Sequence, residues 1–137
     1  MRKDLKELYD RKEFLKDKSR KESVKKRHEK GLRTARENIE HLCDKETFKE
    51  LGSLLVAGQS KRLTQKELIK KTPADGLVAG LGSINKNFFG KEKSKCCIMS
   101  YDYMVLAGTQ GGFNHKKTDR LISIAKKGNL PIVFFVE

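Results

Sequence analysis

The stretch that decides the fold runs from Cys96 to Val136 and reads CCIMSYDYMVLAGTQGGFNHKKTDRLISIAKKGNLPIVFFV. Its first part, Cys96–Leu106, is rich in apolar and aromatic residues and predicts a β-strand. A glycine cluster follows, and the segment Phe113–Lys127 then predicts a helix. The side chains of this helix that we expect to face inwards are Leu121, Ile122, Ile124 and Ala125.

The last run, Leu130–Val136, is wholly apolar and predicts a short strand that is buried on both faces, as in the sheet of an α/β fold. Upstream, Asp75–Ile84 alternates small and apolar residues and predicts another strand. Asn85–Asn87 suits a turn, and Gly90–Lys95 suits a charged loop. The order strand, strand, helix, strand makes a ββαβ unit, so we assign the chain to the α/β class.

Two further segments precede this unit. Thr34 has Glu37 three residues later, which is the spacing of a capping box, and predicts a short helix that ends near Asp44. Gln59–Lys71 is polar and predicts a loop with one helical turn. Because ligands of α/β folds bind in loops that follow the strands, and only Glu137 follows the last strand, we expect the chain to be the front end of a larger domain.

Residues 1–33 are unusually basic, with 14 Lys and Arg against 7 Asp and Glu, which is +7 of the chain's formal charge of +13. They predict a charged helical arm, and residues 34–137 form the second unit. Acidic residues lie between the basic ones at helical spacing, which favours an exposed, solvated helix. Such an arm also suits binding to nucleic acid, but only Tyr9 and Phe14 are available in it for base stacking.

Composition excludes several classes of protein. No apolar run is long enough for a transmembrane helix, and no apolar run follows the basic N-terminus as a signal peptide requires. The chain has three cysteines, two of them adjacent, which argues against a disulfide framework and for a reducing, cytoplasmic location. We therefore expect no membrane partner.

Metal-binding and nucleophilic sites find little support. His41 and Cys43 are two residues apart and do not share a helix face, and Cys96 and Cys97 are expected to point to opposite faces of a strand. These spacings predict structural cysteines and no metal site. Nothing pairs Ser100 with His115 as nucleophile and base. Asp102 is expected to share the strand face of Ser100, as a solvated or edge-facing pair. A self-contained hydrolase site is therefore not expected.

The glycine cluster Gly108–Gly112 lies between a predicted strand and a predicted helix. Backbone amides at a helix N-terminus bind anions in such a setting, and a tight turn that needs small residues is the alternative interpretation. The glycines match neither the dinucleotide-binding nor the P-loop pattern. Basic side chains follow in the first turns of the helix, and they suit either a phosphate ligand or a solvated face: His115, Lys116, Lys117 and Arg120.

Several segments, taken in order, resemble a known family. They are Leu32–Ile39, Thr47–Gly52, Thr72–Asn85, Tyr101–Gly111, His115, Lys117 and Leu130–Phe135. Together they are similar to the N-terminal part of the carboxyltransferase subunit of biotin-dependent acyl-CoA carboxylases, of the propionyl-CoA and acetyl-CoA carboxylase type. The resemblance covers residues 4–137.

This resemblance implies a partial crotonase-like fold, built from ββα units and preceded in this chain by the helical arm. It implies transfer of a carboxyl group from carboxybiotin to the α-carbon of an acyl-CoA, with biotin on a partner carrier. The family's glycine-rich loops that stabilise the oxyanion follow the point where this chain ends. We therefore assign no catalytic residue and expect no activity from the chain alone.

The resemblance places the strand-to-helix loop near the acyl-CoA. The residues that we predict to contact CoA are Gly108, Gly111, Gly112, Lys116 and Lys117, with the two lysines on its phosphates. The implied partners are the remainder of the carboxyltransferase or a second subunit, and biotin carboxylase and carrier subunits. Two alternatives stay open: a basic module that binds RNA or an acidic partner through residues 2–33, and an assembly fragment that pairs with itself or with another subunit through its exposed sheet edge.

Overall fold

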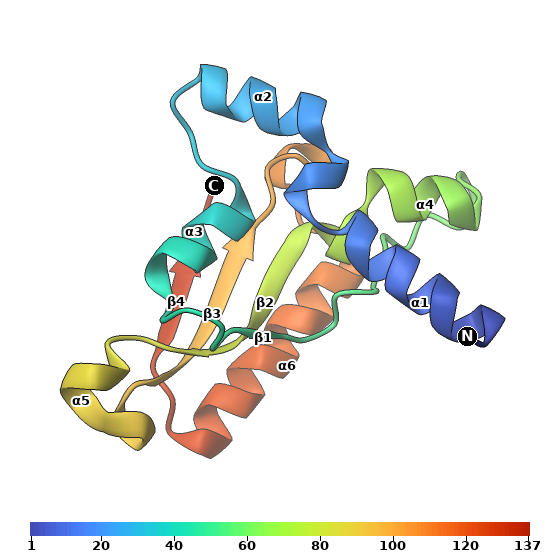
Figure 1. Ribbon diagram of the computed structural model, residues 1–137. Helices are drawn as coiled ribbons and strands as arrows, with labels where there is room; N and C mark the ends of the chain where they lie inside the picture. The colour runs from blue at the N-terminus through green and yellow to red at the C-terminus, as the bar shows by residue number, and fades with distance from the viewer.

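A computed structural model describes all 137 residues, and Figure 1 shows helices on both sides of a small sheet. The helices are α1 (Lys3–Phe14), α2 (Lys21–Glu29), α3 (Ala35–Leu42), α4 (Gln65–Lys71), α5 (Lys86–Lys93) and α6 (Gly112–Gly128). The strands are β1 (Lys49–Glu50), β2 (Leu77–Ser83), β3 (Lys95–Tyr101) and β4 (Ile132–Phe135). Short 3₁₀ turns are η1 (Asp17–Ser19), η2 (Pro73–Gly76) and η3 (Leu106–Gly108).

The four strands form one sheet in the order β1-β2-β3-β4. The pairs β1–β2 and β2–β3 are antiparallel, whereas β3 and β4 are parallel. Parallel neighbours need a crossover, and α6 supplies it by packing across one face of the sheet. The α/β class is therefore confirmed, and β2, β3, α6 and β4 follow the predicted ββαβ order with α5 as an additional helix between β2 and β3.

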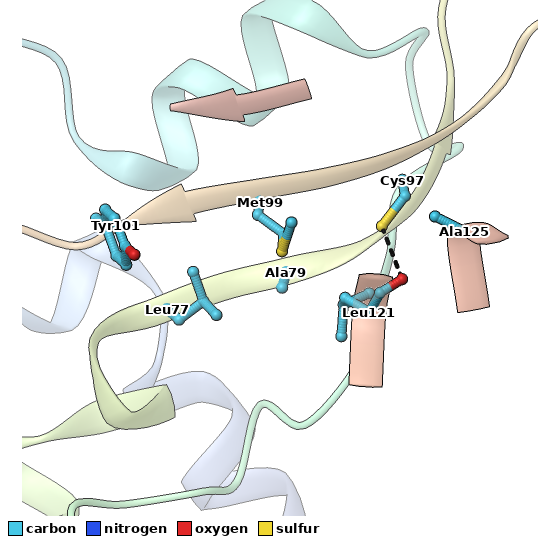
Figure 2. Close-up of a cluster of buried hydrophobic side chains, with 7 residues drawn as sticks. All are labelled: Leu77, Ala79, Cys97, Met99, Tyr101, Leu121 and Ala125. Atoms are coloured by element: carbon cyan, nitrogen blue, oxygen red, sulfur yellow. Dashed lines mark hydrogen bonds between the residues drawn. The ribbon is translucent and has the colours of Figure 1, made fainter. Parts of the chain in front are cut away.

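The face of the sheet that α6 covers holds the larger hydrophobic core (Figure 2). Its buried residues are Leu77, Ala79, Cys97, Met99, Tyr101, Leu121 and Ala125. The Sγ of Cys97 also donates a hydrogen bond to the backbone oxygen of Leu121, at 3.7 Å. The inward positions of Leu121 and Ala125 were predicted correctly, but Ile122 is 45% exposed and does not face the core.

The opposite face is covered by α3 and holds a second core cluster of Ala35, Ile39, Val78, Cys96 and Ile98. Residues alternate between the two clusters along β2 and β3, as the period of two in a strand requires. Cys96 and Cys97 accordingly lie on opposite faces, as predicted. The α3 helix begins with the expected capping box, in which Thr34 accepts a hydrogen bond from the amide of Glu37 and donates its own amide to the Glu37 carboxylate.

Two strand predictions were wrong, the first in where the strand ends and the second in how deeply it is buried. β3 stops at Tyr101 rather than Leu106, because the Asp102 carboxylate accepts a hydrogen bond from the amide of Met104 and turns the backbone. β4 is not buried on both faces. It is an edge strand with a partner on one side only, so its residues stay half-buried or exposed.

Two segments predicted as turns or loops are helices. Gln59–Lys71 contains two turns of α4, which starts at a second capping box between Thr64 and Glu67. The predicted turn and charged loop at residues 85–95 contain α5, which is interrupted at Gly90 by a φ of 79°.

The arm is not one continuous helix. It breaks between Phe14 and Lys21, where the 3₁₀ turn η1 redirects the chain. α1 buries no residue, as expected of a solvated helix, but α2 buries Arg27. The interpretation of the whole arm as an exposed helix is therefore wrong for α2, and the division of the chain at residue 33 stays a prediction.

Candidate functional site

The candidate site lies at the end of the sheet where the carboxyl ends of β3 and β4 meet; this end is called the site edge below. These strands are parallel, so their carboxyl ends share one edge, and α6 begins at the same edge. In α/β folds ligands bind at this end of parallel strands. The loop of residues 102–111, the turn η2 and helix α2 surround this edge.

The predicted glycines follow one another along this loop. Gly108 has a φ of 75°, and the preceding Leu106 and Ala107 also have positive φ, so the backbone is tightly turned there. A β-carbon at Gly111 would lie 3.2 Å from a carboxylate oxygen of Asp75, whereas a β-carbon at Gly112 would meet nothing. The close approach at Gly111 therefore favours glycine for a structural reason.

Asp75 caps the N-terminus of α6 from outside the helix. One of its carboxylate oxygens accepts a hydrogen bond from the amide of Asn114 at 2.7 Å, and its backbone oxygen accepts one from Asn114 Nδ2 at 2.9 Å. Burial raises the pKa of Asp75, and the Asn114 amide opposes that rise. Because a carboxylate of the chain itself occupies this helix end, a bound anion needs other partners.

The two lysines predicted to contact phosphate point in different directions. Lys117 is buried, and its Nζ donates hydrogen bonds to the backbone oxygens of Ala74, at 3.2 Å, and Leu77. Burial lowers its pKa to about 8. Lys116 is exposed, and its Nζ lies 5.7 Å from the centre of the Phe113 ring. Phosphate contact at both lysines stays a prediction, and for Lys117 it requires the amine to leave two carbonyls.

Replacing Lys117 with methionine is expected to remove a rise of stability with pH. The pKa of Lys117 is about 8 in the folded chain against an ordinary 10.5, so the unfolded chain binds more protons between these values. The free energy of unfolding contributed by Lys117 therefore increases from about pH 8 to about pH 10.5, by up to about 3 kcal/mol.

The measurement is urea unfolding of the Lys117→Met variant and of the unmodified chain between pH 7 and 10. Thiols and tyrosines titrate in both proteins, so their effect cancels in the difference between the two free energies of unfolding. The control is Lys116→Met, which should follow the unmodified chain at every pH. Parallel curves for the Lys117 variant and the unmodified chain would contradict the expectation.

A buried ion pair fixes the arm to the site loop. The Arg20 Nη1 lies 2.6 Å from a carboxylate oxygen of Asp102, and both side chains are less than a tenth exposed. Arg20 also approaches Asp17, whose carboxylate accepts a hydrogen bond from Thr34 Oγ1. Of the two predicted settings of Asp102, solvated or edge-facing, the solvated one is wrong, because the side chain is 2% exposed and pairs with Arg20.

A second buried arginine holds α2 against the edge. Arg27 pairs with the carboxylate of Glu137 at 2.5 Å and donates two hydrogen bonds to the backbone oxygen of Arg33. Its guanidinium lies over the ring of Tyr103, 5.2 Å from the ring centre. Between α2 and the loop lies a cavity of about 440 Å³, lined by Ser23, Lys26, Arg27, Lys30, Leu32, Tyr103, Met104 and Glu137.

Sequence reasoning missed these residues of α2. One signal was available, since Ser23, Lys26, Arg27 and Lys30 are three or four residues apart and share one helix face. Of the other candidates, Ser100 is buried within β3 and His115 is exposed on α6. No group of three or more His, Cys, Asp or Glu side chains is placed to hold a metal ion, and no helix is long and apolar enough to span a membrane.

Comparison with known proteins defines the class first: a mixed α/β fold of the crotonase-like carboxyltransferase type. The family model described as the carboxyl transferase domain matches residues 26–137, which is most of the chain. The chain therefore belongs to the carboxyl transferase domain family. The family and the partial crotonase-like fold expected from the sequence are both confirmed.

Curated relatives agree with this assignment. The chain is 34% identical over 130 residues to the biotin-dependent acetyl-/propionyl-coenzyme A carboxylase beta5 subunit of Mycobacterium tuberculosis, covering 94% of this chain and 22% of the relative. It is 31% identical to the propionyl-CoA carboxylase beta chain of Saccharopolyspora erythraea, covering 81% and 18%. The chain thus spans about a fifth of the length of the curated relatives that it matches.

Solved structures show the same likeness. A single-chain, multi-domain long-chain acyl-CoA carboxylase is 47% identical, with a TM-score of 0.95, and the match covers 98% of this chain and 14% of that one. The transcarboxylase 12S structure, described as a hexamer assembly with hydrolysed methylmalonyl-coenzyme A bound, is 28% identical with a TM-score of 0.66, covering 85% and 21%. These likenesses give no support to the alternative of a basic RNA-binding module.

Proposed function

We propose that this chain supplies the acyl-CoA-binding edge of a carboxyltransferase that moves a carboxyl group from carboxybiotin to the α-carbon of an acyl-CoA. The observation that carries the proposal is the 47% identity to a long-chain acyl-CoA carboxylase over 98% of the chain. Biotin, held on a partner carrier, would supply the carboxyl group. No residue of this chain is assigned to hold biotin.

The shape of the site edge supports this function. A loop that borders a bound acyl-CoA has to let the ligand approach its backbone closely, which small residues allow. The loop of residues 102–111 is turned by three successive positive φ values at Leu106, Ala107 and Gly108, and it ends at the start of α6. The space around Gly112 is open there, since a β-carbon at this position would meet nothing within 4 Å. We propose that Gly108, Gly111 and Gly112 border the acyl-CoA.

We propose that the partners are the remainder of a carboxyltransferase and the biotin carboxylase and carrier components, acting in the cytoplasm. The relatives support this because they are named as subunits of biotin-dependent carboxylases. The half-buried edge strand β4 also suits pairing with a further strand, either from the rest of such a domain or from a second copy.

A chimera tests the proposal. In the long-chain acyl-CoA carboxylase that is 47% identical, the matching segment is replaced by this chain, and incorporation of ¹⁴C-bicarbonate into acyl-CoA is measured. We expect the chimera to retain at least about one tenth of the host's rate, a loss of no more than about 1.4 kcal/mol in the barrier.

Two controls accompany the chimera. The host without the matching segment should incorporate no label, and the 137-residue chain alone should release no CO₂ from malonyl-CoA. A folded and assembled chimera without activity would overturn the proposed function. Release of CO₂ by the isolated chain would contradict the expectation that it is inactive alone.

A further inference from the structure

The connection between β2 and β3 carries the two most exposed aromatic side chains of the chain, which together are called the aromatic tip. Phe88 is 84% exposed and Phe89 is 60% exposed, and both lie on α5. Figure 1 shows α5 projecting from one end of the sheet. A β-carbon at Gly90, the next residue, would meet nothing within 4 Å. The two rings are therefore left without a partner inside the chain.

The base of α5 is bound to the sheet, so the aromatic tip has a fixed backbone. The Asp44 carboxylate accepts hydrogen bonds from the amides of Asn85 and Lys86, at 3.1 and 2.8 Å. Across the base, the amide of Ile84 donates to the backbone oxygen of Ser94, at 2.9 Å. The amides of both tip residues donate to the backbone oxygen of Asn85. A contact made through the two rings therefore costs little backbone freedom.

The end of the fold that carries the aromatic tip is strongly basic. Figure 1 shows that α5 and the last turn of α6 lie at the same end of the sheet. The segments there hold seven exposed lysines against three acidic residues, a net of +4: residues 44–46, 86–95 and 126–127. Two of the three acidic side chains are already occupied, because Asp44 binds backbone amides and Glu92 pairs with Lys95 at 3.0 Å. This end of the chain therefore attracts an anionic partner.

The size of the apolar surface favours a membrane over a protein as that partner. At about 200 Å² for one phenylalanine side chain, the two rings expose about 300 Å² between them. Each partner in a stable protein–protein interface contributes about 800 Å². A bilayer requires no complementary surface of that size, because apolar side chains enter its headgroup region and basic side chains are attracted to its anionic lipids. Exposed rings among lysines are the combination that such binding requires.

We propose that this end of the chain binds the surface of an anionic membrane, with the aromatic tip inserted below the headgroups and the surrounding lysines on the lipid phosphates. The expectation of no membrane partner rested on the lack of a transmembrane segment and of a signal peptide, and binding at the membrane surface needs neither. The inference goes beyond the proposed function and does not depend on it.

The proposed contact leaves the site edge free. α5 lies two residues before Lys95, the first residue of β3, whereas the site edge follows Tyr101, the last residue of that strand. Seven extended residues span about 20 Å. A chain bound to a membrane through the aromatic tip therefore still presents residues 102–111 to a ligand.

The test is sedimentation of the 137-residue chain with lipid vesicles. We expect binding to vesicles of phosphatidylcholine that contain about a third phosphatidylglycerol, and no binding to vesicles of phosphatidylcholine alone, because the lysines need anionic lipid. Binding should also weaken as salt is raised, since salt screens the attraction between lysines and lipid.

Substitutions separate the aromatic tip from the general charge of the chain. The double variant Phe88→Ser with Phe89→Ser should weaken vesicle binding at least about tenfold, because it removes the apolar side chains that enter the bilayer. The matched control is Leu5→Ser with Tyr9→Ser, which removes two exposed apolar side chains from the basic helix α1. All four side chains are exposed, so we expect both variants to fold, and the control should bind vesicles as the unmodified chain does.

A tryptophan reports insertion directly, because the chain contains none. In Phe88→Trp, the emission of the new side chain should move to shorter wavelength when anionic vesicles are added, as its ring leaves water. In Tyr9→Trp, on α1, the same vesicles should leave the emission unchanged.

The outcomes decide between the membrane and its alternatives. Equal vesicle binding by the double variant of the aromatic tip and the unmodified chain, or an unshifted emission of Phe88→Trp, would overturn the inference. An equally large loss in the α1 control would also overturn it, since the arm would then be the contact. Binding of poly-glutamate that weakens in the tip variant, without binding to vesicles, would overturn it in favour of an acidic protein. The carboxylase chimera tests the proposed function separately, and neither result alters the other.

Discussion

Replacing Asp102 with alanine is expected to lower the free energy of unfolding by about 3–5 kcal/mol. Asp102 is 2% exposed and neutralises Arg20, whose side chain is 9% exposed. Removing the carboxylate leaves a buried guanidinium without its counter-ion, and it also removes the acceptor of the Met104 amide. Both losses fall on the turn that starts the site loop.

Two further variants identify the cause. Asp119→Ala removes an exposed acidic residue from α6 and should change stability by less than about 0.5 kcal/mol. The double variant Arg20→Met with Asp102→Leu should recover most of the loss, because an apolar pair replaces both charges. Arg20 Nε already lacks a partner, so the ion pair is not fully satisfied.

Urea unfolding measures all of these variants. A loss below about 1 kcal/mol for Asp102→Ala would mean that water compensates the charge of Arg20. That result would contradict a stabilising role for the buried pair between Arg20 and Asp102.

Replacing Gly80 with alanine is expected to cost about 3 kcal/mol or more, because it drives β1 away from β2. A β-carbon at position 80 would overlap the backbone carbonyl of Lys49 and lie 2.9 Å from the Cα of Glu50. These are backbone atoms of the paired strand, so no side-chain rotation relieves the overlap. β1 has only two residues, and separating it also strains the ion pair between Glu50 and Arg36.

The matched control is Gly112→Ala. A β-carbon there meets nothing within 4 Å, and the residue lies in the first turn of α6. Alanine should therefore leave stability unchanged or raise it by up to about 1 kcal/mol. Equal unfolding midpoints for the two variants would show that β1 yields without cost and would contradict the prediction.

The parts of the fold that could be predicted are those that depend on neighbours in sequence. The α3 capping box needs only Thr34 and Glu37, and α6 follows from its own apolar spacing. The end of β3 was missed even though the Asp102 carboxylate accepts its hydrogen bond from the Met104 amide, only two residues later. The pairing of Asp102 with Arg20 could not be predicted in this way, because Arg20 lies 82 residues earlier in the chain. The start of α4 was missed even though Thr64 and Glu67 repeat the same capping signature.

The position of the candidate site, between β3 and α6, could be predicted, but the contacts of its side chains could not. The glycine loop follows β3 as expected, yet the burial of Lys117 was missed. Its spacing from Leu121, four residues later on the inward face of α6, was a usable signal. The α2 residues were missed because the arm was treated as separate from the fold, and ion pairs across so long a separation leave no local pattern.

The two arginine anchors of the arm also bear on the order of folding during synthesis. Arg20 and Arg27 find their carboxylate partners 82 and 110 residues later. The ribosome adds about 5–20 residues per second, so both arginines are made several seconds before their carboxylate partners. Contacts of such long range also slow folding. We therefore expect the contacts of Arg20 with Asp102 and of Arg27 with Glu137 to form late, and the basic face of α2 to stay open to chaperones and proteases in a nascent protein until residues 102 and 137 have left the ribosome.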